Sequence, residues 1–256
     1  MVLDSKKNDL TGKVAIVTGA GQGMGSSIAH SLAERGAAIV VNDINENTAD
    51  STAADIRTYN TKVISYVANV IENLEVEEMI QSAASKFGQV DILVNNAGVL
   101  RPTPLLDISE EEWDYVVDGN LKSTFLCSKA VLPLMQANGW GRVINISSSA
   151  GKNVSTIGGA HYTAGKAAVL GLTRHMAKEV AEYGITVNAV CPGLIETEMV
   201  RSTISEERTK QYADMFPAKR LGLPQEVADL VTFLASDHAS YITGASIDIN
   251  GGDLMI

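Results

Sequence analysis

The sequence is poor in the residues that mark metal centres, disulfide-linked domains and membrane spans. Only two of its 256 residues are cysteines, Cys127 and Cys191, and neither belongs to a CxxC pair, so we expect no metal site and no disulfide framework. No apolar run reaches the roughly 18 residues of a membrane span. The N-terminal stretch MVLDSKKNDLTGK lacks the apolar region of a signal peptide. We therefore expect a reduced, cytoplasmic compartment and no membrane partner.

Positive charge is also scarce. The chain has 20 lysines and arginines against 30 aspartates and glutamates, a net charge of -10. This balance argues against nucleic acid as a partner. Hydrophobic residues make up 45% of the chain, which is typical of a folded protein with a sizeable core. No linker rich in proline, glycine or serine divides the sequence, so we predict one domain over residues 1–256.

Short apolar runs alternate with longer helical patterns along the chain. They are apolar almost throughout, as expected for parallel strands covered on both faces. The alternation predicts a single-domain, Rossmann-like doubly wound parallel sheet of about seven strands, an α/β fold with helices on both faces. The predicted strands are Val14–Gly19, Ala38–Asp43, Val63–Ala68, Asp91–Gly98, Arg142–Ser148, Ile185–Gly193 and Ala245–Gly251.

The helical patterns carry recognisable start and stop signals. Gly36 and Gly88 end two of them and are predicted left-handed caps. Ser109 followed by Glu112 predicts a capping box that opens a long helix over 110–135. Ligands of such sheets bind outside the carboxyl ends of the strands, so the residues that follow each strand are the candidates for function.

The first predicted strand is followed by the glycine-rich stretch TGAGQGMG, Thr18 to Gly25. Glycines allow a tight turn and a close approach to a pyrophosphate, whose charge the next helix's N-terminal amides can meet. The alternative is a simple tight turn. The second strand ends at Asp43, where a carboxylate would bind the adenosine ribose hydroxyls and repel a 2′-phosphate. We therefore predict NAD rather than NADP as the cofactor.

Tyr162 and Lys166 share one face at the start of a helical pattern. A nearby ammonium group would lower the tyrosine pKa from its usual value of about 10 towards the range of an acid–base catalyst. The alternative is an ordinary surface pair. Polar or small residues also follow the neighbouring strands, in NISSSAG, in NNAG and at Pro192–Gly193. These would face the same crevice as Tyr162.

In combination, these motifs resemble the short-chain dehydrogenase/reductase family over about residues 10–252. TGAGQGMG is similar to the family's TGxxxGxG, NNAG is identical to its NNAG, and YTAGK matches its YxxxK. ISSSAG and CPGLIET match its Ser-xx-Gly and PGxxxT elements. The resemblance implies roles for four catalytic residues. Tyr162 would be the general acid/base, Lys166 would lower its pKa, Ser148 would bond the substrate oxygen, and Asn120 would position a water in a proton relay.

Three consecutive serines leave the assignment of Ser148 open, because Ser147 and Ser149 are alternatives.

The resemblance also implies the cofactor contacts. Asn69 stands where the family usually has an aspartate that contacts adenine. The residues expected to bind the cofactor are Gly19, Gln22, Gly23, Met24, Gly25, Asp43, Ile44, Asn69, Val70, Asn96, Ala97, Gly98, Tyr162, Lys166, Pro192, Gly193, Ile195 and Thr197.

We expect the substrate to contact Ser148, Tyr162, His161, Leu194 and Met199. His161 is interpreted as part of the pocket wall or the structure rather than as a base, because no triad or zinc spacing surrounds it. The segment 194–221 is a candidate lid, whose apolar residues Leu194, Met199, Val200, Met215 and Phe216 could exclude water or could simply pack together.

The sequence therefore predicts an NAD-dependent oxidoreductase that interconverts a secondary alcohol and a ketone. One alternative is a 3-oxoacyl-thioester (acyl-carrier-protein) reductase, for which Arg101, Lys152, Arg201 and Lys210 are candidates for docking a carrier. Another is a catalytically silent NAD-binding regulator. The resemblance implies a homotetramer formed through the helices over 110–135 and 162–183 and the C-terminal strand.

Overall fold

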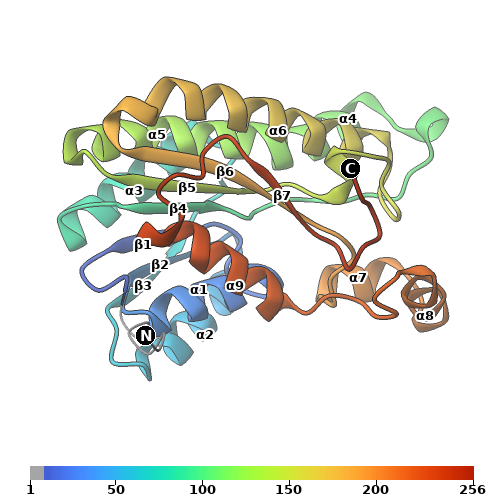
Figure 1. The fold of residues 1–256 in the computed structure, drawn as a ribbon, viewed down its shortest axis with the longest axis horizontal. Coiled ribbons are helices and arrows are strands. Elements are labelled where there is room, and N and C mark those ends of the chain that lie inside the picture. The colour runs from blue at the N-terminus through green and yellow to red at the C-terminus, as the bar shows by residue number, and fades with distance from the viewer. Residues whose placement is uncertain (1–8) are drawn as a thin grey trace.

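The computed structural model describes residues 9–256, which form one parallel seven-stranded sheet with helices on both faces (Figure 1). The predicted doubly wound α/β fold is confirmed. The polar start of the chain, residues 1–8, lies outside the described residues. The strands are β1 (Val14–Val17), β2 (Ala38–Asp43), β3 (Val63–Val67), β4 (Ile92–Asn95), β5 (Gly141–Ile146), β6 (Ile185–Pro192) and β7 (Ser246–Ile249).

Helices connect successive strands and cover the sheet. They are α1 (Gly23–Glu34), α2 (Glu46–Arg57), α3 (Asn73–Phe87), α4 (Glu110–Val117), α5 (Ser123–Asn138), α6 (Ala160–Val180), α7 (Glu198–Thr203), α8 (Glu206–Met215) and α9 (Pro224–Ala235). Helices α1, α2 and α9 lie on one face, and α3, α5 and α6 lie on the other (Figure 1).

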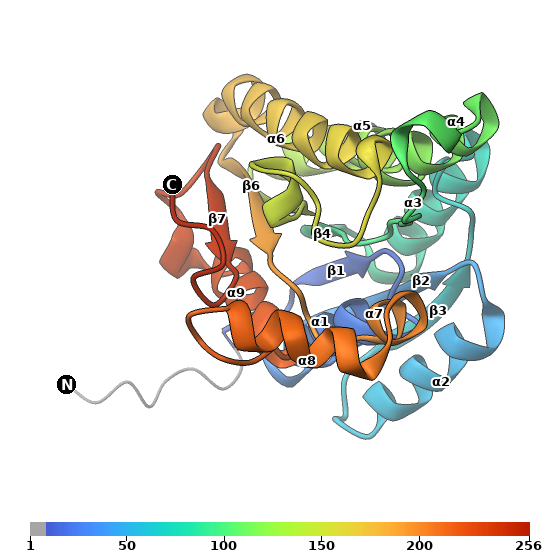
Figure 2. The same cartoon turned by 90° about the vertical axis from the view of Figure 1, so that its right-hand side faces the viewer.

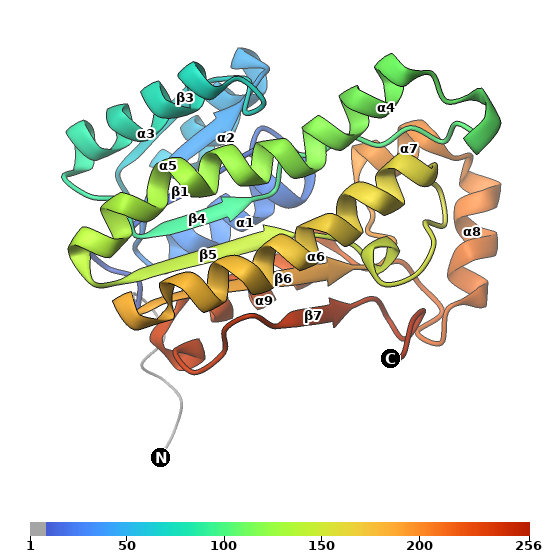
Figure 3. The same ribbon diagram turned by 90° about the horizontal axis from the view of Figure 1, so that it is seen from above.

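The strand order is β3-β2-β1-β4-β5-β6-β7. β1 pairs with β2 on one side and with β4 on the other, so the winding reverses between β1 and β4. In a doubly wound sheet the ligand crevice opens at this reversal, outside the carboxyl ends of the strands. Helices α7 and α8 lie beyond those ends (Figure 3). The loops after β1, β4, β5 and β6 are therefore the candidates for the ligand site.

The apolar strands are explained by two separate cores. Ala15 and Val17 of β1 belong to the cluster beneath α1 and α9, whereas Ile16 between them belongs to the cluster beneath α3 and α5. Successive side chains of a strand point to opposite faces. Because both faces are covered, every position of the strand is buried, and the sequence shows a continuous apolar run rather than an alternating one.

The predicted helix ends are confirmed in part. Gly36 and Gly88 both adopt positive φ, +94° and +86°, as left-handed caps do. Ser109 accepts the backbone N–H of Glu112 at 3.1 Å, which is half of the predicted capping box. The other half is wrong, because the Glu112 carboxylate bonds to His161 instead of returning to the Ser109 backbone.

The long helix predicted over 110–135 is also corrected. It consists of α4 and α5 joined by a π-helical turn over Asp118–Lys122. Within that turn, the Asn120 side chain donates to the carbonyl oxygens of Val116 and Val99, each at 2.7 Å. A side chain that bonds the preceding turn competes with the regular helical ladder. The break could not be predicted from the local sequence, because it depends on the contact between Asn120 and Val99, which are distant in the chain.

Within residues 9–256, no helix combines the length and the apolar composition that crossing a bilayer requires. Nor does this part of the chain bring three or more histidine, cysteine, aspartate or glutamate side chains together as metal ligands would be. The implied homotetramer stays a prediction.

Candidate active site

Two adjoining cavities open at the carboxyl edge of the sheet. The larger, about 340 Å³, runs from the loop after β1 past the ends of β2 and β4. The smaller, about 80 Å³, is enclosed by the loops after β5 and β6 and by α7. Met24, Thr197 and Met199 line both cavities, so the two meet beneath the start of α7. Their size and position suit a nucleotide beside a small reacting group.

The glycine-rich loop after β1 is fixed from β4. The side-chain amide of Asn96 donates to the carbonyl oxygens of Thr18 and Gly19, both at 2.9 Å. The Thr18 hydroxyl in turn accepts the backbone N–H groups of Asn96 and Ala97 at 3.0 Å. These bonds join the TGAGQGMG and NNAG motifs into one rigid floor, from which α1 begins with its N-terminus towards the larger cavity.

Asp43, the last residue of β2, lines the larger cavity. Its carboxylate accepts the backbone N–H of Gly21 at 2.9 Å and that of Asn45 at 3.0 Å. Two backbone donors fix the carboxylate beside the glycine-rich loop. Among the described residues, no lysine or arginine lines the larger cavity, so nothing there would neutralise a 2′-phosphate.

The contacts of Asn69, which also lines the larger cavity, are mainly local. Its side-chain oxygen accepts the N–H of Ile71 at 3.4 Å, and its own N–H donates to Glu75 at 2.7 Å. Asn69 and Val70 line the larger cavity together with Ile44, whose side chain is 69% exposed. An exposed apolar side chain at a cavity mouth suits contact with a flat aromatic base.

Three serines follow β5, and the structure separates their roles. Ser147 lines the smaller cavity but is buried, and its hydroxyl is already used in a bond to the backbone oxygen of Lys166 at 2.8 Å. Ser149 lines the cavity. Ser148 also lines it and forms a side-chain hydrogen bond with Tyr162. The pairing of these two hydroxyls singles out Ser148 among the three.

Burial raises the pKa of Tyr162, and the hydrogen bond from Ser148 lowers it. The Nζ of Lys166 lies 5.7 Å from the centre of the Tyr162 ring, and it donates to the carbonyl oxygen of Ile146 at 2.8 Å. Burial lowers the pKa of Lys166 itself to about 8. Burial, the larger of the two influences, leaves the pKa of Tyr162 above its usual value, and that Lys166 lowers it stays a prediction.

Asn120, Gly98 and Lys166 surround a small polar space behind Tyr162. Asn120 is 1% exposed, and its side-chain oxygen has no hydrogen-bond partner among the described residues. A Cβ on Gly98 would lie 2.6 Å from that oxygen and 3.4 Å from the Lys166 Nζ. Only glycine keeps this space open. A buried, unbonded acceptor next to an amine is the environment in which a polar group of a ligand or a water is bound.

His161 differs from its predicted place. Its side chain is fully buried and lines neither cavity, although Tyr162, the next residue, lines the smaller one. Its ring nitrogens contact Glu112 and the backbone of Tyr162. The expectation that His161 contacts the substrate is therefore corrected, because the first turn of α6 directs adjacent side chains to different sides.

The segment 194–221 forms α7 and α8 and a small core of its own. Leu194, Val200 and Phe216 pack together in this core, whereas Met199 is 44% exposed and lines both cavities. Met215 is 66% exposed and lines neither cavity. Of the five apolar residues suggested for a lid, Met199 is thus the one that lines both cavities, and Leu194 and Val200 line only the smaller one. That the segment moves as a lid stays a prediction.

Most of the predicted site residues gather around these two cavities. The larger is lined by Gly19, Gln22, Gly23, Met24, Gly25, Asp43, Ile44, Asn69, Val70, Asn96, Ala97, Gly98 and Thr197. The smaller is lined by Ser148, Tyr162, Pro192, Gly193, Leu194, Ile195 and Met199. Lys166 and Asn120 lie behind Tyr162 and line neither.

The lining residues that sequence reasoning missed include one group in a loop and one residue of α4. Ser155, Thr156 and Ile157 line the smaller cavity from the loop between β5 and α6, and Tyr115 lines the larger one from α4. The first group had a usable signal, because the chain between Ser148 and Tyr162 must return to the same crevice. Tyr115 had none, since α4 reaches the cavity only through the tertiary fold.

The chain is similar to known proteins over nearly its whole length. A family model described as "Enoyl-(Acyl carrier protein) reductase" matches residues 19–253. The chain is 45% identical over 251 residues to a 3-oxoacyl-(acyl-carrier-protein) reductase of Vibrio cholerae, covering 97% of this chain and 100% of the relative. The chain belongs to the short-chain dehydrogenase/reductase family.

Two further relatives carry the same name. The 3-oxoacyl-(acyl-carrier-protein) reductase of Escherichia coli is 43% identical over 245 residues, which is 96% of this chain and 98% of that protein. A relative from Synechocystis sp. is 44% identical over 248 residues, with the same coverage of 96% and 98%. Membership of this family makes the protein an oxidoreductase that acts on a CH–OH group or the corresponding carbonyl.

Proposed function

We propose that this protein reduces a 3-oxoacyl thioester to the 3-hydroxyacyl thioester, with NADH as the electron donor. The observation that carries the proposal is the 43–45% identity, over nearly the whole chain, to relatives named for that reaction. The smaller cavity is compatible with it, because no charged side chain of the described residues lines it. A neutral, partly apolar pocket suits a keto group on an acyl chain better than a phosphorylated sugar.

The residues of the smaller cavity can carry the reduction. The hydroxyls of Ser148 and Tyr162, which bond to each other, would both meet the 3-oxo oxygen and polarise its carbonyl bond. A reduced nicotinamide supplies two electrons and one hydrogen to the carbonyl carbon. Tyr162 then gives its phenolic proton to the oxygen, so that the product is the neutral alcohol and Tyr162 is left as a phenolate.

Lys166 and Asn120 would restore that proton. A positive Lys166 Nζ stabilises the phenolate, and its pKa of about 8 lets it exchange a proton near neutral pH. The unbonded Asn120 oxygen could orient a water next to it. The space that Gly98 leaves open also fits the nicotinamide ribose, whose hydroxyls would meet the same amine. The residues present therefore fit a nicotinamide dinucleotide.

The choice of NADH rests on the carboxylate of Asp43. It is fixed by the N–H groups of Gly21 and Asn45 and faces a cavity that no lysine or arginine of the described residues lines. A 2′-phosphate there would meet a negative charge without a counter-ion. Exchanging Asp43→Ala should raise the kcat/KM for NADPH relative to NADH by about 10-fold or more. An unchanged ratio would contradict this choice.

The family model's description favours a second candidate, the reduction of an enoyl thioester. That reaction adds hydrogen across a carbon–carbon double bond, which offers no oxygen at the reacting carbon for two hydroxyl donors. The Ser148–Tyr162 pair therefore fits ketone reduction better.

The deciding experiment is the oxidation of NADH or NADPH, followed by absorbance, with paired thioesters of one chain length. Acetoacetyl and crotonyl thioesters are presented on N-acetylcysteamine and on a carrier protein. We expect turnover of acetoacetyl thioester with NADH and little with crotonyl thioester. Turnover of crotonyl thioester alone would support enoyl reduction, and NADH binding without turnover of either would support a silent regulator.

The carrier-protein arm tests how the substrate is presented. Of the four basic residues considered for docking, Lys152 is paired with Asp248 at 2.8 Å and Arg201 with Glu196 at 2.9 Å. Arg101 lies over the ring of Tyr115 at 5.2 Å. With two of the four charges already paired, we expect only a modest preference for the carrier over the N-acetylcysteamine thioester.

A further inference from the structure

The residue before Tyr162 is fixed by two contacts that the reaction above does not use. His161 lies in the first turn of α6 and is fully buried. Its Nδ1 accepts the backbone N–H of Tyr162 at 3.0 Å, and its Nε2 lies 2.9 Å from a carboxylate oxygen of Glu112 on α4. A nitrogen that accepts cannot carry a proton, so both contacts together place the imidazole proton on Nε2, which donates to Glu112.

The Glu112 side chain is itself held by a contact to the loop before α4. Its carboxylate forms a side-chain hydrogen bond with Thr103, and the bonds from Thr103 and His161 lower its pKa. Its backbone N–H donates to Ser109, the cap of α4. The carboxylate therefore stays ionised and in place at neutral pH, as an acceptor for the His161 ring.

The backbone packs closely around the imidazole. The N–H of Gly159 donates to the carbonyl oxygen of Arg101 at 2.7 Å. A Cβ on Gly159 would lie 2.6 Å from the Thr103 carbonyl oxygen and 2.7 Å from Cε1 of His161. The ring thus fills the space between α4 and the start of α6, which lie side by side (Figure 2).

The bond to the Tyr162 N–H has a structural reason. The first N–H groups of a helix have no partner within it. The cap residue of α6 is Gly159, which has no side chain that could accept from these N–H groups. His161 accepts the N–H of Tyr162 instead, so the orientation of this turn depends on where Glu112 holds the ring.

We propose that Glu112 and His161 are positioning residues for Tyr162, and that they set the angle at which its phenol meets the substrate carbonyl. The inference rests on the proposed role of Tyr162 as proton donor but not on the identity of the ketone. Reaction rates are sensitive to such placement, since a shift of about 1 Å can cost about 100-fold in rate.

The test compares three variants on α4 with the full-length enzyme. Glu112→Ala removes the acceptor and should lower kcat by about 10- to 100-fold while the KM for NADH stays within about twofold. Glu112→Gln should recover most of the loss, because its amide oxygen can accept from Nε2 in the same place. Glu111→Ala is the matched control, since its side chain is exposed and forms no ion pair or side-chain hydrogen bond with other described residues. It should leave kcat unchanged.

A second measurement needs no substrate. Hydrogen exchange at the Tyr162 amide should become faster in Glu112→Ala and stay slow in Glu112→Gln, because the His161 ring that accepts from this amide loses its anchor only in the first. This arm remains decisive if the wild-type enzyme reduces no 3-oxoacyl thioester, in which case only the proposed function fails. The inference would be overturned if Glu112→Ala kept both the wild-type kcat and the wild-type rate of hydrogen exchange at the Tyr162 amide. Equal kcat losses in Glu112→Ala and Glu112→Gln would also overturn it, since the charge alone would then matter.

Discussion

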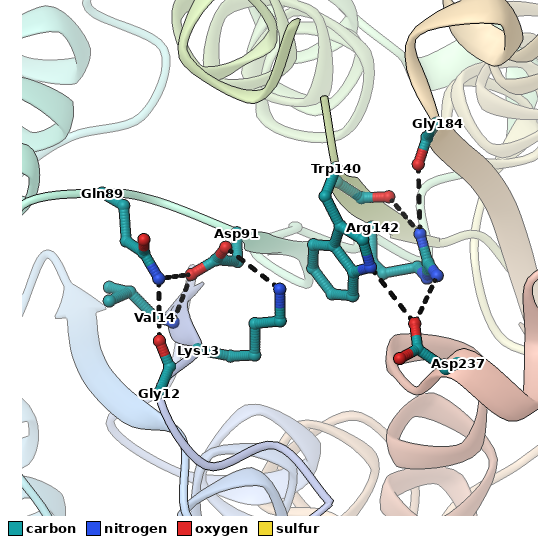
Figure 4. Close-up of polar contacts among 10 residues, drawn as sticks. Gly12, Lys13, Val14, Gln89, Asp91, Trp140, Arg142, Gly184 and Asp237 are labelled. Atoms are coloured by element: carbon teal, nitrogen blue, oxygen red, sulfur yellow. Dashed lines mark hydrogen bonds and ion pairs between the residues drawn. The ribbon is translucent and has the colours of Figure 1, made fainter. Parts of the chain in front are cut away.

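At the amino edge of the sheet the buried charges are paired, whereas at the carboxyl edge buried polar groups next to the cavities keep part of their bonding capacity unused. Asp91, just before β4, accepts the N–H of Val14 at 2.8 Å and the amide of Gln89 at 2.7 Å, and lies 3.5 Å from the Lys13 ammonium (Figure 4). This carboxylate joins the starts of β1 and β4.

Trp140 continues this arrangement next to β5. Its ring lies between two cations, with the Lys13 Nζ 3.4 Å and the Arg142 guanidinium carbon 4.2 Å from the ring centre. Its indole N–H and Arg142 both bond to Asp237, at 3.1 and 3.0 Å (Figure 4). Each charge here has an opposite charge or an aromatic face beside it.

The carboxyl edge differs in what it leaves unbonded. The Asn120 oxygen has no partner among the described residues, and Lys166 is buried with a carbonyl oxygen, not a carboxylate, as its hydrogen-bond partner. Unused bonding capacity destabilises a folded chain unless a ligand uses it. We therefore propose that the amino edge of the sheet stabilises the fold and that the carboxyl edge forms the active site. Four predictions test this division.

The largest effect is expected at Tyr162. Exchanging Tyr162→Phe removes the proton donor and should lower kcat/KM by about 1000-fold. The free energy of unfolding, measured in urea, should change by less than about 1 kcal/mol, because the ring still fills its place. A large loss of stability would show that the two edges are not separable in function.

Lys166 sharpens the comparison through pH. Burial lowers its pKa from 10.5 to about 8, so the unfolded chain binds the proton more tightly than the folded one. Between these two values the unfolded state holds more protons, and stability therefore rises with pH across this window. At neutral pH the cost is about 3 kcal/mol.

Exchanging Lys166→Met should remove that cost. Relative to the variant, the wild type should gain about 3 kcal/mol of unfolding free energy from about pH 7 to about pH 11. Denaturant unfolding of both proteins at matched pH measures the difference. A constant difference would mean that Lys166 is not destabilised by its burial.

Asp91 probes the opposite edge. Exchanging Asp91→Ala leaves the buried N–H of Val14 without its acceptor and should lower the free energy of unfolding by about 2 kcal/mol. We expect kcat per mole of folded enzyme to be unchanged. Asp55→Ala, on an exposed position of α2, serves as the control. A fall in kcat with Asp91→Ala would break the proposed division of labour.

The smallest effect is expected at Trp140. Exchanging Trp140→Leu removes both cation–π contacts but keeps an apolar side chain, and should lower the free energy of unfolding by about 1 kcal/mol. Phe125→Leu provides the comparison, because that ring is 44% exposed and has one cation at 5.9 Å. Equal effects would show that the flanking cations contribute nothing measurable.

The sequence carries most of the site because its chemistry follows strand ends. Asp43 ends a buried strand, Asn96 directly follows one and Ser148 follows another by two residues, and parallel strands end at the same edge. The position of Tyr162 and Lys166 four residues apart on a helix was likewise readable from spacing alone. The choice of Ser148 among three serines could not be predicted from spacing, because it depends on which serine hydroxyl lies next to Tyr162.

By itself, the sequence determined the class of fold, the strand ends at which the candidate site lies and the tyrosine proposed as acid–base catalyst, because periodicity and motif spacing are local properties. Only the tertiary structure decided that Asn120 lies in a π-helical turn, that Lys166 is buried with a lowered pKa, and that the buried His161 contacts Glu112. These depend on contacts between residues distant in the chain, which burial and close packing bring together.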